Sequence, residues 1–261
     1  MAIEDKDGVW RTIRRRRVFI KDGESLEQAL ERSKKAYNSQ ENKAVGLAKK
    51  VNENQNQKQK VNNKSFETKK QARDYFEQIS KKWENALNDF EKESIKGYTD
   101  LTYNKINTYL RNPKEVYIYR NFNKQEIEKQ IQGIDAAISK FDLPNDIVVY
   151  RGTNIMEFGK DLNDIEDLKK LIGEEITLTG YSSTSTDKGV ADRDFDGEVL
   201  IEYNIPKGKG KGAYLEFIST MKDLDEDQKE SEFLLKRNSK IKINEVEERQ
   251  DGKILVSAEV I

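Results

Sequence analysis

Ile147-Val148-Val149-Tyr150-Arg151-Gly152 is an apolar, β-branched run that ends in an arginine and a glycine. This composition predicts a strand. The run lies just after Pro144, where the sequence changes character. Before Pro144, apolar residues recur every three or four positions, which indicates amphipathic helices, whereas short apolar runs follow it. Because helices and strands are segregated along the chain, we predict an α+β fold and not an alternating, doubly wound one.

Three amphipathic helices are predicted before Pro144. The first has one apolar face made of Phe76, Ile79, Trp83, Leu87 and Phe90. In the second, Tyr103, Asn107 and Arg111 follow one another at i, i+4 spacing and therefore lie along one stripe. The third covers about residues 124–140, with four isoleucines on one face. Further strands are predicted around residues 198–203, 233–235 and 254–256.

The composition predicts a soluble protein with a modest core. Hydrophobic residues make up 35% of the 261 residues, fewer than the 36% that are charged. No apolar run approaches the roughly 18 residues of a membrane-spanning helix, and the polar segment 1–6 lacks the apolar core of a secretory signal. We expect neither a membrane span nor export by that signal. The cytoplasm of the producing or target cell, another secretion route, a virion and release by lysis all remain open.

The chain contains no histidine and no cysteine. This excludes disulfides, Ser-His-Asp and Cys-His catalysis, and metal sites built on histidine or cysteine. Acid-base work therefore falls to carboxylates, and we expect no metal.

The N-terminal region differs from the rest of the chain. Five arginines stand close together at positions 11, 14, 15, 16 and 17, which suits contact with nucleic acid or another anionic surface, or a solvated basic strand. A strand at 18–20, a turn, a capping box of Ser25 and Gln28, and a helix to about Tyr37 complete a small basic unit over residues 1–50. In residues 52–64, eleven of thirteen are Asn, Gln or Lys. We therefore predict a polar linker over 51–64 and a globular domain over 65–261.

Glu230 and Glu232 stand one residue apart in Glu230-Ser231-Glu232-Phe233-Leu234-Leu235. On an extended segment both carboxylates face the same side, roughly 6 to 7 Å apart. A retaining glycosidase instead flanks its sugar with two carboxylates, so a same-side pair suits stabilising a cation and positioning a nucleophile, as in transfer of a ribosyl group. The alternative is a solvated strand, on which this pattern is common.

Two other motifs carry suitable polar groups. Arg151 at the end of its strand can form bidentate bonds to phosphate, and Gly152 lets a ligand approach the backbone. A nearby carboxylate is the alternative partner of Arg151. Ser183-Thr184-Ser185 offers hydroxyls that can hold a carboxylate or a sugar hydroxyl, or else forms a polar strand end. The lysine- and glycine-rich run 207–212 lacks the phosphate-loop pattern and predicts a turn between strands.

Taken in order, these motifs resemble the arginine-serine-glutamate class of mono-ADP-ribosyltransferases, which includes the enzymatic components of actin-modifying binary toxins and the Rho-modifying exoenzymes. The resemblance covers about residues 65–261. Its signature residues are Arg151, Ser183, Glu230 and Glu232. Supporting matches are Tyr98, residues 103–107, residues 109–111, and residues 205–208 leading to 212–215.

The resemblance implies helices packed on two antiparallel sheets that enclose a cleft for NAD, which is the substrate. Glu232 would bind the nicotinamide-ribose hydroxyl and favour the oxocarbenium-like state as nicotinamide leaves. Glu230 would orient the guanidinium of a target arginine; relatives with glutamine here modify asparagine or similar acceptors. Ser183 would hold the Glu232 side chain. The implied partner is therefore a host protein that carries the acceptor arginine.

Other residues are assigned to NAD by the same resemblance. Arg151 and Arg111 would hold the phosphates and Gly152 the carboxamide, while Tyr103 and Asn107 match nucleotide-site positions on the family's helix. Phe195 would cover the nicotinamide, although Asp196-Gly197 follows it where the binary toxins carry an arginine. The loop 219–229 would recognise the target protein. It is acidic and lacks an aromatic anchor.

Residues 8–14 and 17–23 also resemble segments of phage minor head proteins that carry such transferase domains. This second resemblance suggests a phage origin and a bacterial target; without it, a secreted toxin acting on actin would lead. The predicted reaction is transfer of ADP-ribose from NAD to a protein arginine. The alternatives are a catalytically silent phage structural protein and an NAD hydrolase without a protein acceptor.

Overall fold

The computed structural model describes residues 8–13, 16–21, 23, 25, 28, 63–116, 119, 122–159, 161–194, 197–219 and 229–261. The chain divides into two compact units. One comprises Met1–Asn62 with Arg193–Asp196, and the other comprises Asn63–Asp192 with Gly197–Ile261.

The described part of the smaller unit contains an antiparallel hairpin of β1 (Gly8–Ile13) and β2 (Arg16–Lys21). The predicted strand at 18–20 is confirmed. The capping box is also present: the Gln28 amide donates to Ser25 Oγ (3.2 Å) and the Ser25 amide to Gln28 Oε1 (2.9 Å). The helix expected to about Tyr37 and linker residues 51–62 lie outside the described residues.

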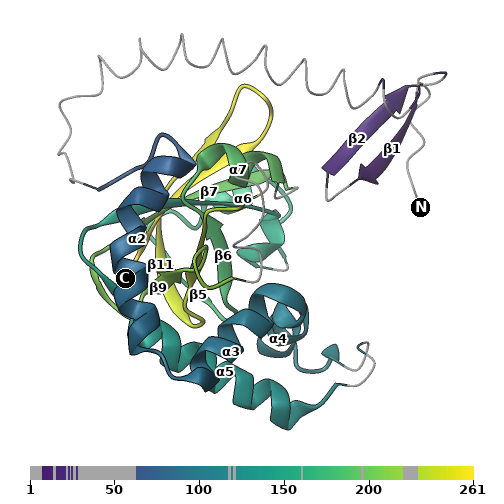
Figure 1. Cartoon of the computed structure of the whole chain (residues 1–261). Coiled ribbons are helices and arrows are strands. Elements are labelled where there is room, and N and C mark those ends of the chain that lie inside the picture. Colours follow the sequence, from purple (N-terminus) through teal and green to yellow (C-terminus); the bar gives the residue numbers. More distant parts are fainter. Residues whose placement is uncertain are drawn as a thin grey trace. The chain divides into compact units, whose positions relative to one another are not determined.

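The larger unit begins with helices, which lie beside and at one end of its strands (Figure 1). The helices before the first strand of the central sheet are α2 (Lys69–Ala86), α3 (Asp89–Gly97), the π-helix η1 (Tyr98–Thr102), α4 (Tyr103–Arg111) and α5 (Lys124–Ser139). The predicted second and third helices are thereby confirmed. Three short helices follow later: η3 (Ile155–Glu157), α6 (Ile165–Lys169) and α7 (Lys188–Asp194).

The prediction of one continuous helix face from Phe76 to Phe90 is wrong. The helix ends at Ala86, and Asn88 begins α3 through a capping box with Glu91. Phe76 and Trp83 face the core, whereas Phe90 is 39% exposed. The break has a local cause, because an asparagine followed three residues later by a glutamate satisfies two backbone amides at a new helix start.

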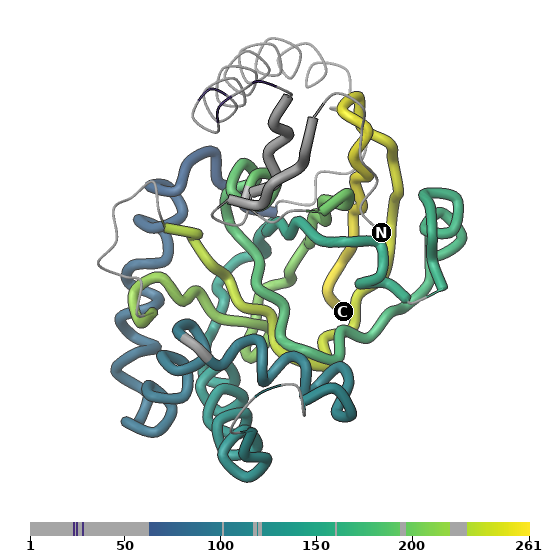
Figure 2. The backbone as a smooth tube through the Cα atoms, turned by 90° about the vertical axis from the view of Figure 1, so that its right-hand side faces the viewer, coloured from purple at the N-terminus to yellow at the C-terminus, as the bar shows by residue number. Residues whose placement is uncertain are grey.

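Eight strands form the central sheet, in the order β5-β11-β12-β7-β4-β6-β10-β9. They are β4 (Ile147–Thr153), β5 (Glu175–Leu178), β6 (Ser182–Ser185), β7 (Val199–Ile205), β9 (Gly212–Tyr214), β10 (Glu232–Leu235), β11 (Ser239–Glu248) and β12 (Ile254–Val260). All neighbours are antiparallel except β12 and β7. The hairpin of β11 and β12 is the yellow segment of Figure 2. The short strands β3 (Asp142–Leu143) and β8 (Gly208–Lys209) pair separately.

The α+β class is confirmed. The two sheets that the resemblance implied are joined here into one eight-stranded sheet. The link is between β4 and β6, whose described register consists of the single pair Tyr150 and Ser185. This sparse pairing separates β5-β11-β12-β7-β4 from β6-β10-β9. The sheet can therefore change direction at the point where Arg151 and Ser183 lie.

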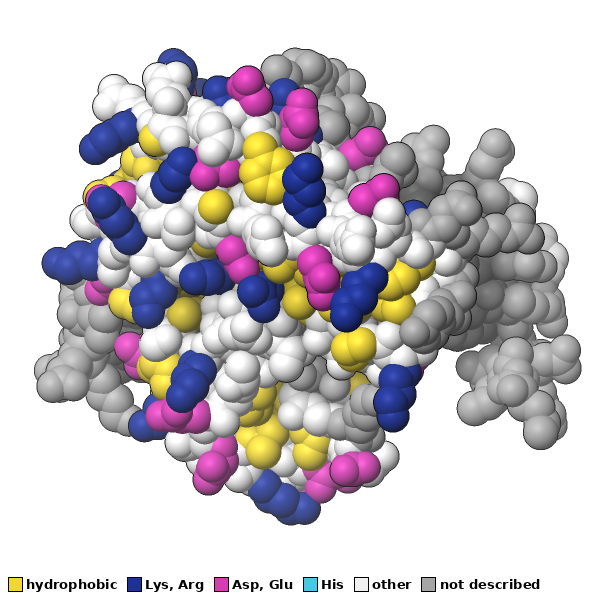
Figure 3. Space-filling view, turned by 90° about the horizontal axis from the view of Figure 1, so that it is seen from below, with side chains coloured by type: hydrophobic (Ala, Val, Ile, Leu, Met, Phe, Trp, Pro, Cys, Tyr) yellow, Lys and Arg dark blue, Asp and Glu magenta, His cyan; other side chains and the backbone are white. Residues whose placement is uncertain are grey.

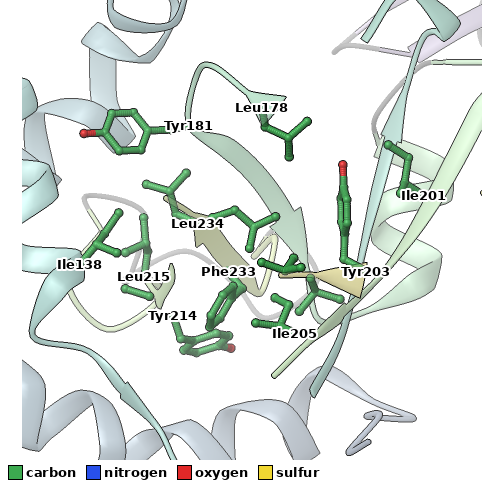
Figure 4. Close-up of a cluster of buried hydrophobic side chains, with 14 of the residues drawn as sticks. Ile138, Leu178, Tyr181, Ile201, Tyr203, Ile205, Tyr214, Leu215, Phe233 and Leu234 are labelled. Atoms are coloured by element: carbon green, nitrogen blue, oxygen red, sulfur yellow. The ribbon is translucent and has the colours of Figure 1, made fainter. Parts of the chain in front are cut away.

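One part of the core of the larger unit lies between α2 and the strands β9 and β10. The Phe76 ring stacks on Tyr214 with centroids 4.3 Å apart, and Phe233 is the register partner of Tyr214 (Figure 4). Full burial of a side chain of this size contributes about 1.5–3 kcal/mol. The packing fixes β10, and with it the position of Glu232 at the strand's first residue.

On the surface, basic and acidic side chains are interspersed over the face seen in Figure 3. No helix in the described part of the chain is long and apolar enough to cross a membrane. Asn63 and Lys64, at the end of the predicted linker, already pair with the larger unit, since the Lys64 amide donates to the Asp146 carbonyl (2.8 Å).

Candidate active site

Three neighbouring strands bring the predicted signature residues together. Arg151 lies on β4, Ser183 on β6 and Glu232 on β10, and these strands are adjacent in the sheet. Arg151 Nη1 donates a hydrogen bond of 2.8 Å to the Ser183 carbonyl. Residues up to 81 positions apart in the sequence thus form one polar cluster at the join of the sheet.

Glu232 is the most strongly perturbed carboxylate of this cluster. Burial, with a smaller effect of the negative charge of Glu230, raises the pKa of Glu232 to about 7, although a hydrogen bond from Ser183 and the charge of Arg151 act to lower it. Ser183 thus lies beside the Glu232 carboxylate, and its role in holding that side chain stays a prediction. A carboxylate poised near neutral pH is typical of a functional site.

The segment that carries Glu230 and Glu232 is not extended as expected. Strand β10 begins only at Glu232, and Ser231 has a φ of 48°, in the left-handed region. The conformation is held from the side of β6, because Ser185 Oγ donates to the Glu230 carbonyl (2.7 Å) and the Thr186 amide to the Ser231 carbonyl (3.1 Å). Both glutamates still line one small cavity of about 30 Å³. A kinked backbone, and not strand periodicity, brings the two carboxylates together.

Glu157 is a site residue that sequence reasoning missed. Its carboxylate lies 3.4 Å from Arg151 Nη2 and 3.5 Å from Arg111 Nη2, and its side chain is only 12% exposed. Burial alone would raise the pKa of Glu157, but the two arginine charges and hydrogen bonds from Arg151 and Thr153 outweigh burial and hold the pKa below its usual value. Arg151 therefore has a carboxylate as a partner, which is the alternative to a phosphate that the sequence left open. The available signal was a single acidic residue six positions after Arg151, too common a pattern to single out.

Arg111 and Glu157 line a cavity of about 330 Å³ beside the cluster. Gly180 also lines it, and a Cβ added there would lie 3.0 Å from Arg111 Nε and 2.9 Å from Asn107 Oδ1. The glycine thereby lets the β5–β6 turn approach α4. Arg151 Nε is buried and has no hydrogen-bond partner among the described residues.

The remaining NAD candidates are placed differently. Asn107 is bonded within the protein at both ends of its amide: its Oδ1 accepts from the Tyr181 amide (2.9 Å), and its Nδ2 donates to the Tyr98 hydroxyl (3.0 Å). Tyr103 is partly buried against the core, and Gly152 is buried within β4, opposite Leu200. Contacts of these three residues with NAD stay predictions. Phe195 and loop residues 220–228 lie outside the described residues.

Comparison with known proteins places the chain in one family. Residues 72–261 match the family of ADP-ribosyltransferase exoenzymes, and the chain belongs to this family. A curated relative, the NAD(+)–arginine ADP-ribosyltransferase EFV of Enterococcus faecalis (strain ATCC 700802 / V583), is 36% identical over 176 residues. The match covers 64% of this chain and 31% of the relative, so the chain spans about a third of the length of that protein.

Solved structures with the same fold include toxins and exoenzymes. Plx2a, an ADP-ribosyltransferase toxin from Paenibacillus larvae, is 31% identical with a TM-score of 0.60, over 74% of this chain and 96% of Plx2a. The C3 exoenzyme of Clostridium limosum matches in fold at 24% identity, with a TM-score of 0.62 over 76% and 97% of the two chains. The toxin BECa of a C. perfringens binary enterotoxin, solved with NADH, is 25% identical with a TM-score of 0.59, over 73% of this chain and 48% of BECa. The resemblance of the N-terminal segments to phage minor head proteins stays a prediction.

Proposed function

We propose that this protein transfers ADP-ribose from NAD to an arginine side chain of a protein acceptor. The observation that carries the proposal is the Arg151, Ser183 and Glu232 cluster on three adjacent strands, with Glu230 lining the same small cavity as Glu232. Family membership and the activity for which the Enterococcus relative is named support this reaction.

The reaction breaks the bond between the nicotinamide nitrogen and the ribose carbon, and the electron pair leaves with nicotinamide. The guanidinium nitrogen of the acceptor then forms a bond to that carbon and loses a proton. Glu232 accepts a hydrogen bond from the ribose hydroxyl as a carboxylate, and its negative charge stabilises the cationic ribose in the transition state. The hydroxyl of Ser183 holds this carboxylate in place.

The second carboxylate provides selectivity for the acceptor. Glu230 accepts hydrogen bonds from the incoming guanidinium and receives its proton, so the nucleophilic nitrogen points at the ribose carbon. Water, which is the nucleophile in NAD hydrolysis, needs no such orientation. Removing the Glu230 charge should therefore impair arginine transfer more than NAD hydrolysis.

The arginine pair suits the NAD phosphates. Arg151 has a buried donor without a partner among the described residues, which a phosphate oxygen would satisfy. Arg111 lines the adjacent cavity of about 330 Å³, which is of the size that ligand pockets have. Because Glu157 contacts both guanidinium groups, NAD must share or replace these contacts when it binds.

The acceptor is, in this proposal, a protein of a target cell, since relatives such as Plx2a and BECa are named as toxins. Labelled NAD incubated with bacterial and animal lysates tests the reaction, the acceptor and the host together. We expect label on a protein, mapped to an arginine. Label that appears solely as free ADP-ribose would instead identify an NAD hydrolase, and unconsumed NAD would identify a catalytically silent protein.

A further inference from the structure

A second buried charged cluster lies beside the two glutamates of the site. Its centre is Glu216, which follows strand β9 and is 7% exposed. Glu216 Oε2 accepts a 2.5 Å hydrogen bond from the Tyr214 hydroxyl. Glu216 Oε1 lies 3.6 Å from Arg73 Nε on α2 and 3.9 Å from Lys229 Nζ. The proposed reaction uses none of these four residues.

Lys229 connects this cluster to the site, because it immediately precedes Glu230. Lys229 is itself 7% exposed, and its carbonyl accepts a 2.6 Å hydrogen bond from Lys69 Nζ. Glu216, Lys229 and Glu230 line the same cavity of about 30 Å³ as Glu232. The chain is thus held on the Lys229 side by α2 and Glu216.

The chain is also held on the other side of Glu230. Ser185 binds the Glu230 carbonyl, Thr186 binds the Ser231 carbonyl, and Ser231 itself is left-handed. A non-glycine residue in this conformation is strained and persists only where the surroundings determine the backbone. Burial of an ion pair is also a poor source of stability, because desolvation offsets the attraction. The left-handed Ser231 and the buried Glu216–Lys229 pair both cost stability, and they lie on either side of Glu230. Their presence indicates that the direction of the Glu230 carboxylate matters.

We infer that the Glu216–Lys229 ion pair is a positioning device for Glu230, which fixes the carboxylate at the point where the acceptor guanidinium arrives. This inference rests on the proposed function. Lys229 and Glu216 would act through Glu230 and not on NAD itself. Their loss should therefore lower arginine transfer and leave NAD hydrolysis almost unchanged.

The test is the ratio of protein labelling to free ADP-ribose release, measured with labelled NAD and lysate for the wild type and for Lys229→Met. We expect the ratio to fall by about tenfold or more, equivalent to about 1.4 kcal/mol, with hydrolysis within about twofold of the wild type. Lys229→Arg, which keeps the charge, should recover most of the transfer. The matched control is Lys140→Met. It breaks a 2.6 Å pair with Glu91, which is 4% exposed, and neither residue lines the two cavities of the site, so the ratio should stay unchanged.

A double variant separates positioning from general disturbance. If Lys229 acts through Glu230, Lys229→Met should lower transfer no further in a Glu230→Gln background. Equal ratios in the wild type and Lys229→Met, or additive losses in the double variant, would overturn the inference alone. A wild type that labels no protein would overturn the proposed function as well.

Folding is checked by circular dichroism. If Lys229→Met does not fold, Glu216→Gln is measured in its place, with the same expected fall in ratio. If neither variant folds, the ion pair serves stability and the positioning role is overturned.

Discussion

Glu232 is held between its charged and neutral forms by its surroundings. Burial and the charge of Glu230 raise its pKa to about 7, against the Ser183 hydrogen bond and Arg151. Because the carboxylate form supports the proposed reaction, kcat/KM for NAD should rise with pH through an apparent pKa near 7 and level off above it. Initial rates between pH 5 and pH 9 would measure this profile. A rate that is flat between pH 5 and pH 9 would contradict the assignment.

Glu157 should stabilise the folded protein at neutral pH and lose this effect in acid. Its pKa is lowered in the folded protein, so its contribution is present above the unfolded-state pKa and is lost as the pH falls through the folded-state pKa. Glu157→Gln should reduce the free energy of unfolding by about 1–3 kcal/mol at pH 7, since it removes two partly buried charged contacts. Below about pH 5 the difference from wild type should shrink.

Urea unfolding at pH 7 and pH 4 measures this effect. The control is Glu166→Gln, which breaks an exposed pair with Lys169 (2.7 Å) on α6 and should leave the free energy of unfolding almost unchanged. A loss for Glu157→Gln that is the same at both pH values would contradict the ion-pair account.

At the residue scale, the sequence could indicate those site residues whose types rarely occur together in one order along a chain. Arg151, Ser183 and the two glutamates could be predicted because their order is characteristic of a family. Glu157 could not, since its role depends on Arg111 of α4 and Arg151 of β4 both reaching it, and no local pattern reports those contacts. The left-handed Ser231 was also beyond prediction, because Ser185 and Thr186 hold it from another strand.

Elements differ in how well local patterns define them. Helix α5 could be predicted because its isoleucines keep one face. Strand β11 could not, because its buried Ile241, Ile243 and Val246 are separated by charged and polar residues and a register shift after Ile243 breaks their alternation. Strand β6 is short and made of serine and threonine, so its burial comes from its neighbours and not from its own composition.

The break between α2 and α3 gives a prediction at this scale. Asn88→Ala removes the side chain that caps α3 through the Glu91 amide (2.9 Å) and should lower the free energy of unfolding by about 1 kcal/mol. Asn88→Gly should cost only a few tenths of a kcal/mol, because glycine tolerates a cap position. Thermal or urea unfolding compares them. A helix that remains equally stable after Asn88→Ala would mean that the cap does not define the boundary.

For the whole molecule, segregation of helical and strand patterns was enough to predict the α+β class. The order of the strands was not predictable from local patterns, because neighbours such as β4 and β6 or β12 and β7 pair over long distances in the sequence. That long-range pairing is what creates the site: strands β4, β6 and β10 each supply one member. The proposed activity is therefore a property of the assembled sheet.

The most direct measurement of the central claim compares Glu232→Gln and Glu230→Gln with the wild type, with protein labelling and free ADP-ribose release recorded in the same reaction. Glu232→Gln should lose both activities by about 10² to 10³-fold, because the charge that stabilises the cationic ribose is gone. Glu230→Gln should lose protein labelling and retain most NAD hydrolysis. Wild-type rates of both reactions in Glu232→Gln would contradict the account.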